Sequence, residues 1–204
     1  FRSAHGLYGG AKGKSYEDML HIRYFLTFPD EFWAFYKNVM LYPDAKPNAA
    51  HAALARLEDA GKLDCVLTQN IDGLHQAAGS KRVIELHGSI HRCRCARCGK
   101  PCPEEAVNTG EGVTRCSCGG VLRPEVVLYE EPLAERDITD AVNFIRKADV
   151  LIVGGTSLAV YPAAGLLRYY EGRKLALVNM GATSYDESAD LLIREKIGKV
   201  FSEV

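Results

Sequence analysis

Short apolar segments alternate with segments of helical spacing along most of this chain of 204 residues. The run at residues 149–154 (Asp-Val-Leu-Ile-Val-Gly) is continuously apolar, as is typical of a strand buried on both faces, and residues 134–147 and 162–171 beside it have helical spacing. Strand–helix alternation of this kind predicts an α/β fold with a doubly wound parallel, Rossmann-like sheet. The other expected strands are residues 63–68, 83–86, 174–179 and 190–193.

Capping residues indicate two further helices. Asn48 precedes an alanine- and leucine-rich stretch, residues 49–60, and Gly61 follows it. An N-cap amide and a glycine in the left-handed conformation are common at the two ends of a helix, so we expect a helix here. Residues 72–78 form a shorter candidate helix that ends at Gly79.

Two regions interrupt the alternation. Residues 15–46 are rich in aromatic side chains, and their helical spacing predicts a small helical module with an aromatic core, divided near Pro29. Residues 91–120 are rich in cysteine and predict a second small module. The remaining residues, 47–90 and 121–204, are expected to form the Rossmann-like part.

Polar side chains follow two of the expected strands. Gln69, Asn70 and Asp72 come directly after residues 63–68, and His87 comes directly after residues 83–86. Open α/β sheets bind ligands at the carboxyl ends of their strands. Amides bind sugar hydroxyls and carboxamides, and a histidine transfers protons near neutral pH. These residues therefore predict a binding site with an acid–base group.

Two more strand ends point to a nucleotide. Gly155, Thr156 and Ser157 follow the run at residues 149–154, and Asn179 ends the strand at residues 174–179. Glycine allows close approach of a ligand, and the hydroxyls and amides can bind ribose or phosphate oxygens. Each signal is weak alone, and the convergence of polar groups at four strand ends is what indicates a nucleotide site.

Six of the seven cysteines fall between positions 93 and 118, which favours metal binding over disulfides. One pair has C-x2-C spacing and the other C-x-C spacing, and four thiolates would form a closed structural zinc site. Cys93 and Cys102 are left over, and Cys93 with Cys95 offers an alternative register. A set of packed, reduced thiols without metal is the competing interpretation. The expected zinc ligands are Cys95, Cys98, Cys116 and Cys118.

The composition is ordinary for a globular protein, with 47% hydrophobic and 25% charged residues. The net charge of −1 gives no reason to expect strong nonspecific attraction to nucleic acid or to an anionic membrane. We see no apolar run long enough to span a bilayer and no signal peptide, so the expected location is cytoplasmic.

The chain resembles the sirtuin family of NAD-dependent protein lysine deacylases from Phe1 to about Phe201. The resemblance rests on residues 68–72 (Thr-Gln-Asn-Ile-Asp), 86–88 (Leu-His-Gly), 123–124 (Arg-Pro), 155–157 (Gly-Thr-Ser) and 178–179 (Val-Asn), and on the paired cysteines. It implies one catalytic domain over residues 1–204, with NAD as co-substrate, a structural zinc ion and an acetylated lysine in a protein or peptide as substrate. It also favours Cys95 over Cys93 as a zinc ligand.

The resemblance implies a role for each matching residue. Asn70 would contact the nicotinamide ribose and a nearby water, and Ile71 and Asp72 would hold the carboxamide. His87 would be the base that takes a proton from a ribose hydroxyl after the acyl oxygen has displaced nicotinamide, which leads to O-acyl-ADP-ribose. The other implied NAD contacts are Phe1, Arg2, Gln69, Gly155, Thr156, Ser157, Asn179, Met180 and Ile197, and the implied peptide contacts are Val127, Tyr129 and Val160.

The sequence departs from the family pattern in two places. The family carries a glycine-rich segment upstream of a Phe-Arg pair, whereas this sequence opens at Phe1-Arg2. We expect a fragment of a longer protein, and a truncated gene product with damaged NAD binding is the alternative. Family members that remove acidic acyl groups carry a Tyr-x-x-Arg pair, and residues 33–38 have no arginine but do have Lys37. A neutral acyl group such as acetyl is expected. A mono-ADP-ribosyltransferase and an inactive zinc-stabilised binding module are the alternatives.

Overall fold

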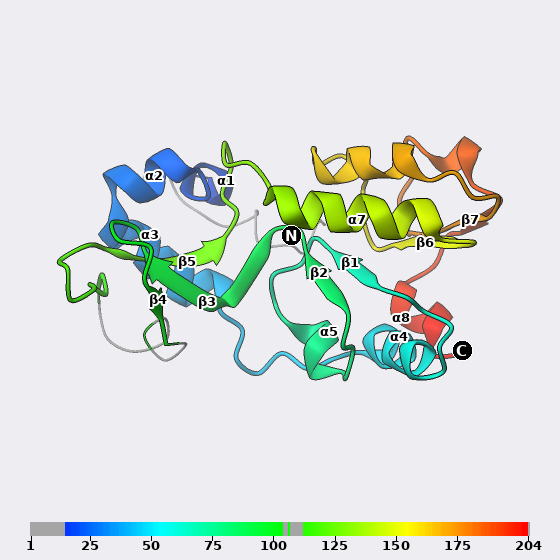
Figure 1. Ribbon diagram of the computed structural model, residues 1–204, viewed down its shortest axis with the longest axis horizontal. Coiled ribbons are helices and arrows are strands. Elements are labelled where there is room, and N and C mark those ends of the chain that lie inside the picture. The colour runs from blue at the N-terminus through cyan, green and yellow to red at the C-terminus, as the bar shows by residue number, and fades with distance from the viewer. Residues whose placement is uncertain (1–14, 104–105, 107–111, 204) are drawn as a thin grey trace. The chain divides into compact units, whose positions relative to one another are not determined.

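The computed structural model describes residues 15–103, 106 and 112–203 (Figure 1). Phe1 and Arg2 therefore lie outside the described residues. The chain divides into two compact units. The first contains the described residues up to Asp44 together with Asn70–Gly73 and His87–Pro132, and the second contains Ala45–Gln69, Leu74–Leu86 and the described residues from Leu133 onward.

An aromatic core holds the helices of the first unit together. Pro29 stands in the first turn of α3, where its missing N–H costs nothing, and this confirms the predicted division of the helical module. Phe32, Trp33 and Tyr36 are fully buried in the core, whereas Phe28 is 43% exposed. The helices are α1 (Tyr16–Met19), α2 (Ile22–Thr27), α3 (Pro29–Phe35) and the π-helical η2 (Tyr36–Met40).

The same unit contains a three-stranded antiparallel sheet in the order β4–β3–β5. Its strands are β3 (Gly88–Cys95), β4 (Pro101–Cys102) and β5 (Leu122–Val126). The pairing of β3 with β5 is irregular between Ser89 and Cys93. The Trp33 indole N–H donates to the Leu122 carbonyl oxygen over 3.0 Å, which connects the aromatic core to β5.

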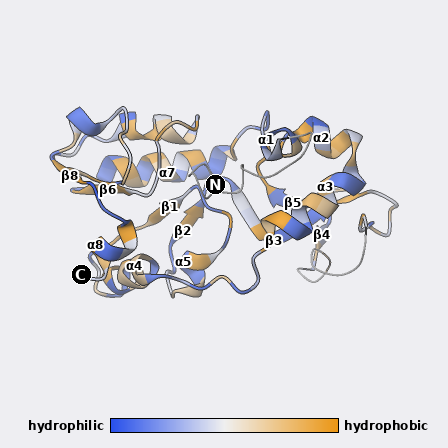
Figure 2. Cartoon of the chain, turned by 180° about the vertical axis from the view of Figure 1, so that it is seen from behind, coloured by the Kyte–Doolittle hydropathy of each residue, from blue (hydrophilic) through white to orange (hydrophobic). Residues whose placement is uncertain are grey.

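The second unit contains parallel strands, as the strand–helix alternation predicted. β1 (Val66–Thr68) pairs with β2 (Val83–Glu85), and β7 (Leu175–Val178) pairs on its two sides with β6 (Leu151–Gly154) and β8 (Leu191–Ile193). Within the described part of the chain these strands form two sheets, β1–β2 and β6–β7–β8. Mostly hydrophobic residues make up β1 and β2 (Figure 2).

Helices cover both sides of these strands: α7 and η3 lie on one side, and α4, α5 and α8 on the other (Figure 1). The α4 helix begins as predicted, because the Asn48 side chain accepts from the backbone N–H groups of Ala50 and His51, and Gly61 follows its end with φ +66°. The helices are α4 (Ala49–Asp59), α5 (Leu74–Ala77), α7 (Glu135–Lys147), the 3₁₀-helical η3 (Ala163–Tyr169) and η4 (Asp186–Ser188), and α8 (Ile197–Phe201).

One expectation about this unit is wrong. Residues 149–154 were expected to be buried on both faces, but Val150 is 50% exposed and Ile152 is 46% exposed. Val150 and Ile152 alternate along the chain with the partly buried Leu151 and Val153, so the described residues cover one face of this segment and leave the other open. Among the described helices, none is long and apolar enough to cross a membrane.

Candidate functional site

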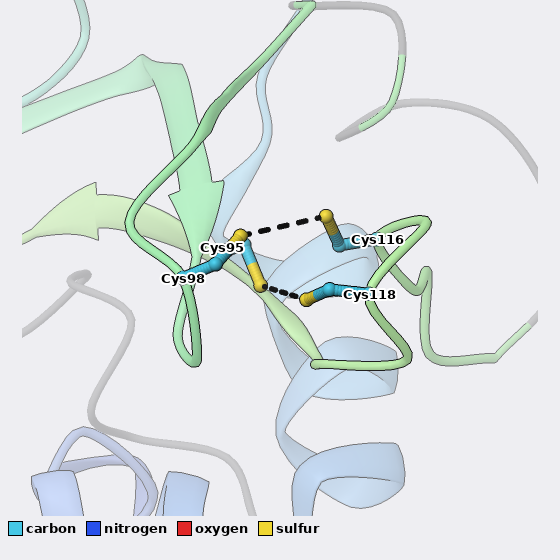
Figure 3. A group of neighbouring side chains, drawn as sticks. All are labelled: Cys95, Cys98, Cys116 and Cys118. Carbon is cyan, nitrogen blue, oxygen red and sulfur yellow. Dashed lines mark hydrogen bonds between the residues drawn. The ribbon is translucent and has the colours of Figure 1, made fainter.

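Four cysteine side chains converge at one end of β3 in the first unit (Figure 3). Cys95 ends the strand and Cys98 follows in a tight turn, while Cys116 and Cys118 come from a second turn. All four sulfurs lie within 4.8 Å of one another, with Cys95–Cys118 at 3.5 Å and Cys98–Cys116 at 3.8 Å. A tetrahedral zinc ion with Zn–S bonds of about 2.3 Å needs sulfurs about 3.8 Å apart. The cluster has the donor set and spacing of a closed structural zinc site.

Backbone N–H groups favour the thiolate form of two of these cysteines, which is the form that binds a metal cation. The Cys98 N–H lowers the pKa of Cys95, and the Cys118 N–H lowers the pKa of Cys116 to about 6. At Cys118 the Gly120 N–H also lowers the pKa, but the neighbouring sulfurs, Cys95 first, outweigh it and raise the pKa to about 11. Four crowded sulfurs disfavour a fourth negative charge until a cation offsets it.

Gly120 is needed for this closure. A Cβ added at Gly120 would lie 2.6 Å from the Cys95 sulfur and 2.6 Å from the Arg97 Cβ. Glycine therefore lets the second turn approach the first closely enough for the sulfurs to meet.

Cys93 and Cys102 lie outside the cluster. They face each other across β3 and β4 and form a disulfide, with their Cα atoms 5.4 Å apart. The structure thus brings Cys95 into the four-cysteine cluster in place of Cys93, as predicted. The clustering of six cysteines predicted metal binding in preference to disulfides. The structure has both a four-thiol cluster and one cross-strand disulfide, so the prediction covered four of the six.

The Asn70–Gly73 loop is held against β3 in the same unit. The Ile90 N–H donates to the Ile71 carbonyl oxygen over 2.9 Å, and His91 Nε2 lies 3.0 Å from the Asp72 carbonyl oxygen. Ile71 also packs against the aromatic core. The three residues expected to hold the nicotinamide end, Asn70, Ile71 and Asp72, are therefore carried by one anchored loop.

His87 stands immediately before β3. Its carbonyl oxygen accepts from the Val127 N–H over 2.9 Å. Gly88 follows with φ +77°, and a Cβ at this position would collide with the Glu125 carbonyl oxygen. Only glycine lets the chain turn from His87 into β3 while β5 lies this close, so the backbone at His87 has a defined position.

The expected peptide-binding residues Val127 and Tyr129 lie in a segment held from two directions. The Tyr129 N–H donates to the Leu20 carbonyl oxygen over 2.9 Å, and the Ile22 N–H donates to the Tyr129 carbonyl oxygen over 3.2 Å. The His21 ring stacks on Tyr129 with centroids 5.1 Å apart. The segment therefore pairs with the helical module on one side and with His87 on the other.

An ion pair closes the segment into a loop. The Arg123 guanidinium donates to both carboxylate oxygens of Glu131, over 2.6 and 2.8 Å, and Glu131 also accepts from the Leu128 N–H over 2.9 Å. Burial would raise the pKa of Glu131, but these hydrogen bonds outweigh it and leave the pKa below its usual value. No sequence pattern predicted a role for His21 or Glu131, and Arg123 belongs to the family pattern alone.

The residues expected to contact the far end of the nucleotide gather in the second unit. Gly155, with φ +64°, follows β6 and donates its N–H to the Val178 carbonyl oxygen over 3.0 Å. Asn179 follows β7 and donates its side-chain amide to the Gly181 carbonyl oxygen over 3.0 Å. A Cβ at Gly154 would collide with the Ile197 side chain. Gly155, Asn179 and Ile197 therefore share the carboxyl ends of two adjacent parallel strands.

The remaining predicted residues take their places around these strands. The Thr156 hydroxyl accepts from the Leu158 N–H over 3.2 Å, and Ser157 lies in the same turn. Met180 follows Asn179 and is largely exposed. Val160 precedes η3 and accepts from the Ala164 N–H over 2.9 Å. Gln69 directly follows β1.

Comparison with known proteins gives a consistent result. The model of the Sir2 family matches residues 1–162. The "NAD-dependent protein deacetylase" of Cutibacterium acnes is 53% identical over 206 residues, which cover 100% of this chain and 84% of that protein. The protein of the same name from Clostridium acetobutylicum is 53% identical over 208 residues, with coverage of 100% and 85%.

Solved structures agree. One described as "Sir2 bound to acetylated peptide" has a TM-score of 0.84 and 38% identity, and the match covers 91% of this chain and 81% of that chain. Another, "Sir2-p53 peptide-NAD+", has a TM-score of 0.85 and 37% identity, with coverage of 97% and 85%. These structures confirm the α/β fold class with its small cysteine module, and together with the family match they show that this chain belongs to the Sir2 family.

Proposed function

We propose that this chain is an NAD-dependent protein lysine deacetylase, which converts an acetylated lysine and NAD into deacetylated lysine, nicotinamide and O-acetyl-ADP-ribose. One observation carries the proposal. The Asn70–Gly73 loop and the His87–Gly88 turn, which contain the expected nicotinamide and proton-transfer residues, are both fixed to the start of β3. Relatives that are 53% identical bear the name of this activity.

The first unit supplies the chemical end of the site. NAD provides the ribose carbon from which nicotinamide departs. His87 accepts a proton from a ribose hydroxyl, and Asn70 orients that ribose and a neighbouring water. Ile71 and Asp72 hold the carboxamide, and the hydrogen bonds of their carbonyl groups to β3 support this role.

The second unit supplies the adenine-side contacts. Gly155, Thr156 and Ser157 bind the phosphates and ribose through amides and hydroxyls at the end of β6. Asn179 binds the adenine-side ribose, and Ile197 packs beside the adenine. Gln69 and Met180 complete the described contacts, and Phe1 and Arg2 are assigned to NAD by the family resemblance alone.

Val127, Tyr129 and Val160 bind the acetylated peptide. A neutral acyl group is supported by Lys37, whose ammonium group donates to the Gly112 carbonyl oxygen over 3.3 Å and lies 5.6 Å from the centre of the Trp33 ring. The Lys37 ammonium group thus binds a carbonyl oxygen and an aromatic ring, and we propose that it does not bind the carboxylate of an acidic acyl group. The proposed location is cytoplasmic: the four-thiol cluster is typical of a reducing compartment, whereas the Cys93–Cys102 disulfide is more usual in an oxidising one.

Zinc has a structural role in this proposal. Cys95, Cys98, Cys116 and Cys118 fill all four positions of a tetrahedral ion, which leaves no open position for water or substrate. The ion would hold the two turns of the cysteine module together and take no part in the reaction.

The test is an incubation of the native full-length protein with labelled NAD and an acetylated peptide, with His87→Ala as the control. Free nicotinamide together with O-acetyl-ADP-ribose, lost in the variant, is the expected result. Label retained on protein would indicate an ADP-ribosyltransferase instead, and no turnover would indicate a binding module.

A further inference from the structure

His91 lies on β3, four positions after His87, and its ring contacts the loop that contains Asn70, Ile71 and Asp72. No sequence pattern predicted a function for His91. The distance of 3.0 Å between its Nε2 atom and the Asp72 carbonyl oxygen is that of a good hydrogen bond. This contact belongs entirely to the first unit.

A bulge in β3 makes the contact possible. Ser89 pairs with Glu125 and Cys93 pairs with Pro124, so residues 90–92 are inserted on β3 where β5 has no extra residue. Bulges redirect side chains and release backbone groups from the ladder. The Ile90 N–H is thereby free to reach the Ile71 carbonyl oxygen, and the His91 N–H is held by the buried Ser89 hydroxyl over 3.2 Å.

Gly73 fits against the His91 ring. It has φ +69°, and a Cβ added there would lie 2.9 Å from His91 Cδ2 and 3.0 Å from Nε2. The ring therefore packs directly on the backbone where the loop ends. Two adjacent carbonyl groups, those of Ile71 and Asp72, are bound by two adjacent residues of the bulge.

The chemistry of the bond indicates positioning and not proton transfer. A carbonyl oxygen only accepts, so Nε2 must donate. The neutral imidazole with a proton on Nε2 and the doubly protonated ring both provide this donor. Deprotonation of the other ring nitrogen therefore leaves the bond intact.

We propose that His91 is a positioning residue for the nicotinamide end of NAD: its Nε2–H donates to the Asp72 carbonyl oxygen and, with the Ile90 amide, holds the Asn70–Gly73 loop in its binding geometry. The inference rests on the proposed function, because that function places the nicotinamide at this loop. A loop held in its bound geometry costs less free energy to order when the ligand binds.

The test compares three variants of the native full-length protein. His91→Phe keeps a flat ring but removes the donor, His91→Gln can restore a donor near the Nε2 position, and Arg92→Gln is the matched control in the same bulge. For His91→Phe we expect the KM for NAD and the concentration of nicotinamide that halves turnover to rise about three- to tenfold, the usual effect of one lost hydrogen bond. The KM for the peptide should stay unchanged, and His91→Gln and Arg92→Gln should lie within about twofold of wild type.

Thermal unfolding and zinc content confirm that each variant is folded. The inference is overturned if folded His91→Phe has wild-type NAD and nicotinamide values, if His91→Gln is as defective as His91→Phe, or if His91→Gln shifts the pH profile of turnover. An inactive wild-type protein would contradict the deacetylase proposal instead. Calorimetric titration of wild type and His91→Phe with NAD would then decide the role of His91, with equal affinities counting against it.

Discussion

At the scale of single residues, two glycines with similar positive φ angles have very different neighbours. Gly88 and Gly99 have φ values of +77° and +71°. A Cβ at Gly88 would collide with the Glu125 carbonyl oxygen, whereas a Cβ at Gly99 would meet nothing within 4 Å. The two positions separate the cost of a left-handed backbone from the cost of a steric clash.

Gly99→Ala should therefore lower the free energy of unfolding by about 1–2 kcal/mol, the cost of a left-handed non-glycine residue. Gly88→Ala should cost several times more, because β3 and β5 must move apart as well. Chemical denaturation of both variants measures the difference. Equal losses would show that β5 relaxes away from the added methyl group without cost.

His87 should matter for turnover and little for stability. Replacing a general base typically costs about 10²–10⁴ in rate, and His87→Ala should lose turnover by an amount in this range. The backbone there is held through the Val127 N–H and the Gly88 turn, neither of which needs the imidazole. Turnover measures the expected loss of activity, and thermal unfolding measures the expected unchanged stability. Near-normal turnover in a folded variant would exclude His87 as the base.

At the scale of elements, the sequence predicted helix ends better than strand pairing, because caps act on neighbouring residues and strands pair with distant ones. The α4 helix was placed to within one residue at its end, because Asn48 and Gly61 act on their immediate neighbours. The β3 strand and its bulge were not foreseen, since they depend on β5, whose paired residues are 27 to 38 positions away in the sequence. The role of His91 was missed for the same reason. The spacing predicted two cysteine pairs but left Cys93 and Cys95 as alternatives, and the family resemblance favoured Cys95, which lies in the four-cysteine cluster.

The Arg123–Glu131 pair connects β5 to the segment that holds Val127 and Tyr129. Glu131→Gln weakens a charged, partly buried pair and should lower the free energy of unfolding at pH 7 by about 1–3 kcal/mol. Because the pKa of Glu131 is lowered in the folded state, its contribution is present above the unfolded pKa and is lost as pH falls through the folded pKa.

The stability difference between wild type and Glu131→Gln should therefore shrink below about pH 4, near the ordinary glutamate pKa. Denaturation curves of both proteins from pH 7 down to pH 3 measure it. A difference that stays constant over this range would show that the lost contact is a packing effect with no dependence on the carboxylate charge.

At the scale of the whole molecule, the two units have separate buried clusters. In the first, the aromatic core is continuous with Cys93 and Cys95 of the cysteine module and with Leu122 of β5. In the second, Ala50, Ala53 and Phe201 form a cluster of their own between α4 and α8. Loss of the metal should consequently act on the first unit and spare the second.

The single tryptophan of the chain, Trp33, lies in the first unit, so its fluorescence reports on that unit alone. Trp33 is fully buried, and its indole donates to the carbonyl group of Leu122, which pairs with the cluster residue Cys95. Structural zinc contributes about 10 kcal/mol or more to folding, as much as the whole stability of many domains. A strong zinc chelator should therefore shift the Trp33 emission to longer wavelength as water reaches the ring.

The helical circular dichroism signal should fall only in part, because α4 and α7 lie in the second unit. Metal analysis should find one zinc per chain in wild type and in Cys93→Ser, and much less in Cys95→Ser, whose emission should already resemble that of the chelated protein. If Cys93→Ser released the metal, the assigned ligand set would be wrong. If chelation removed the whole helical signal, the two units would unfold as one.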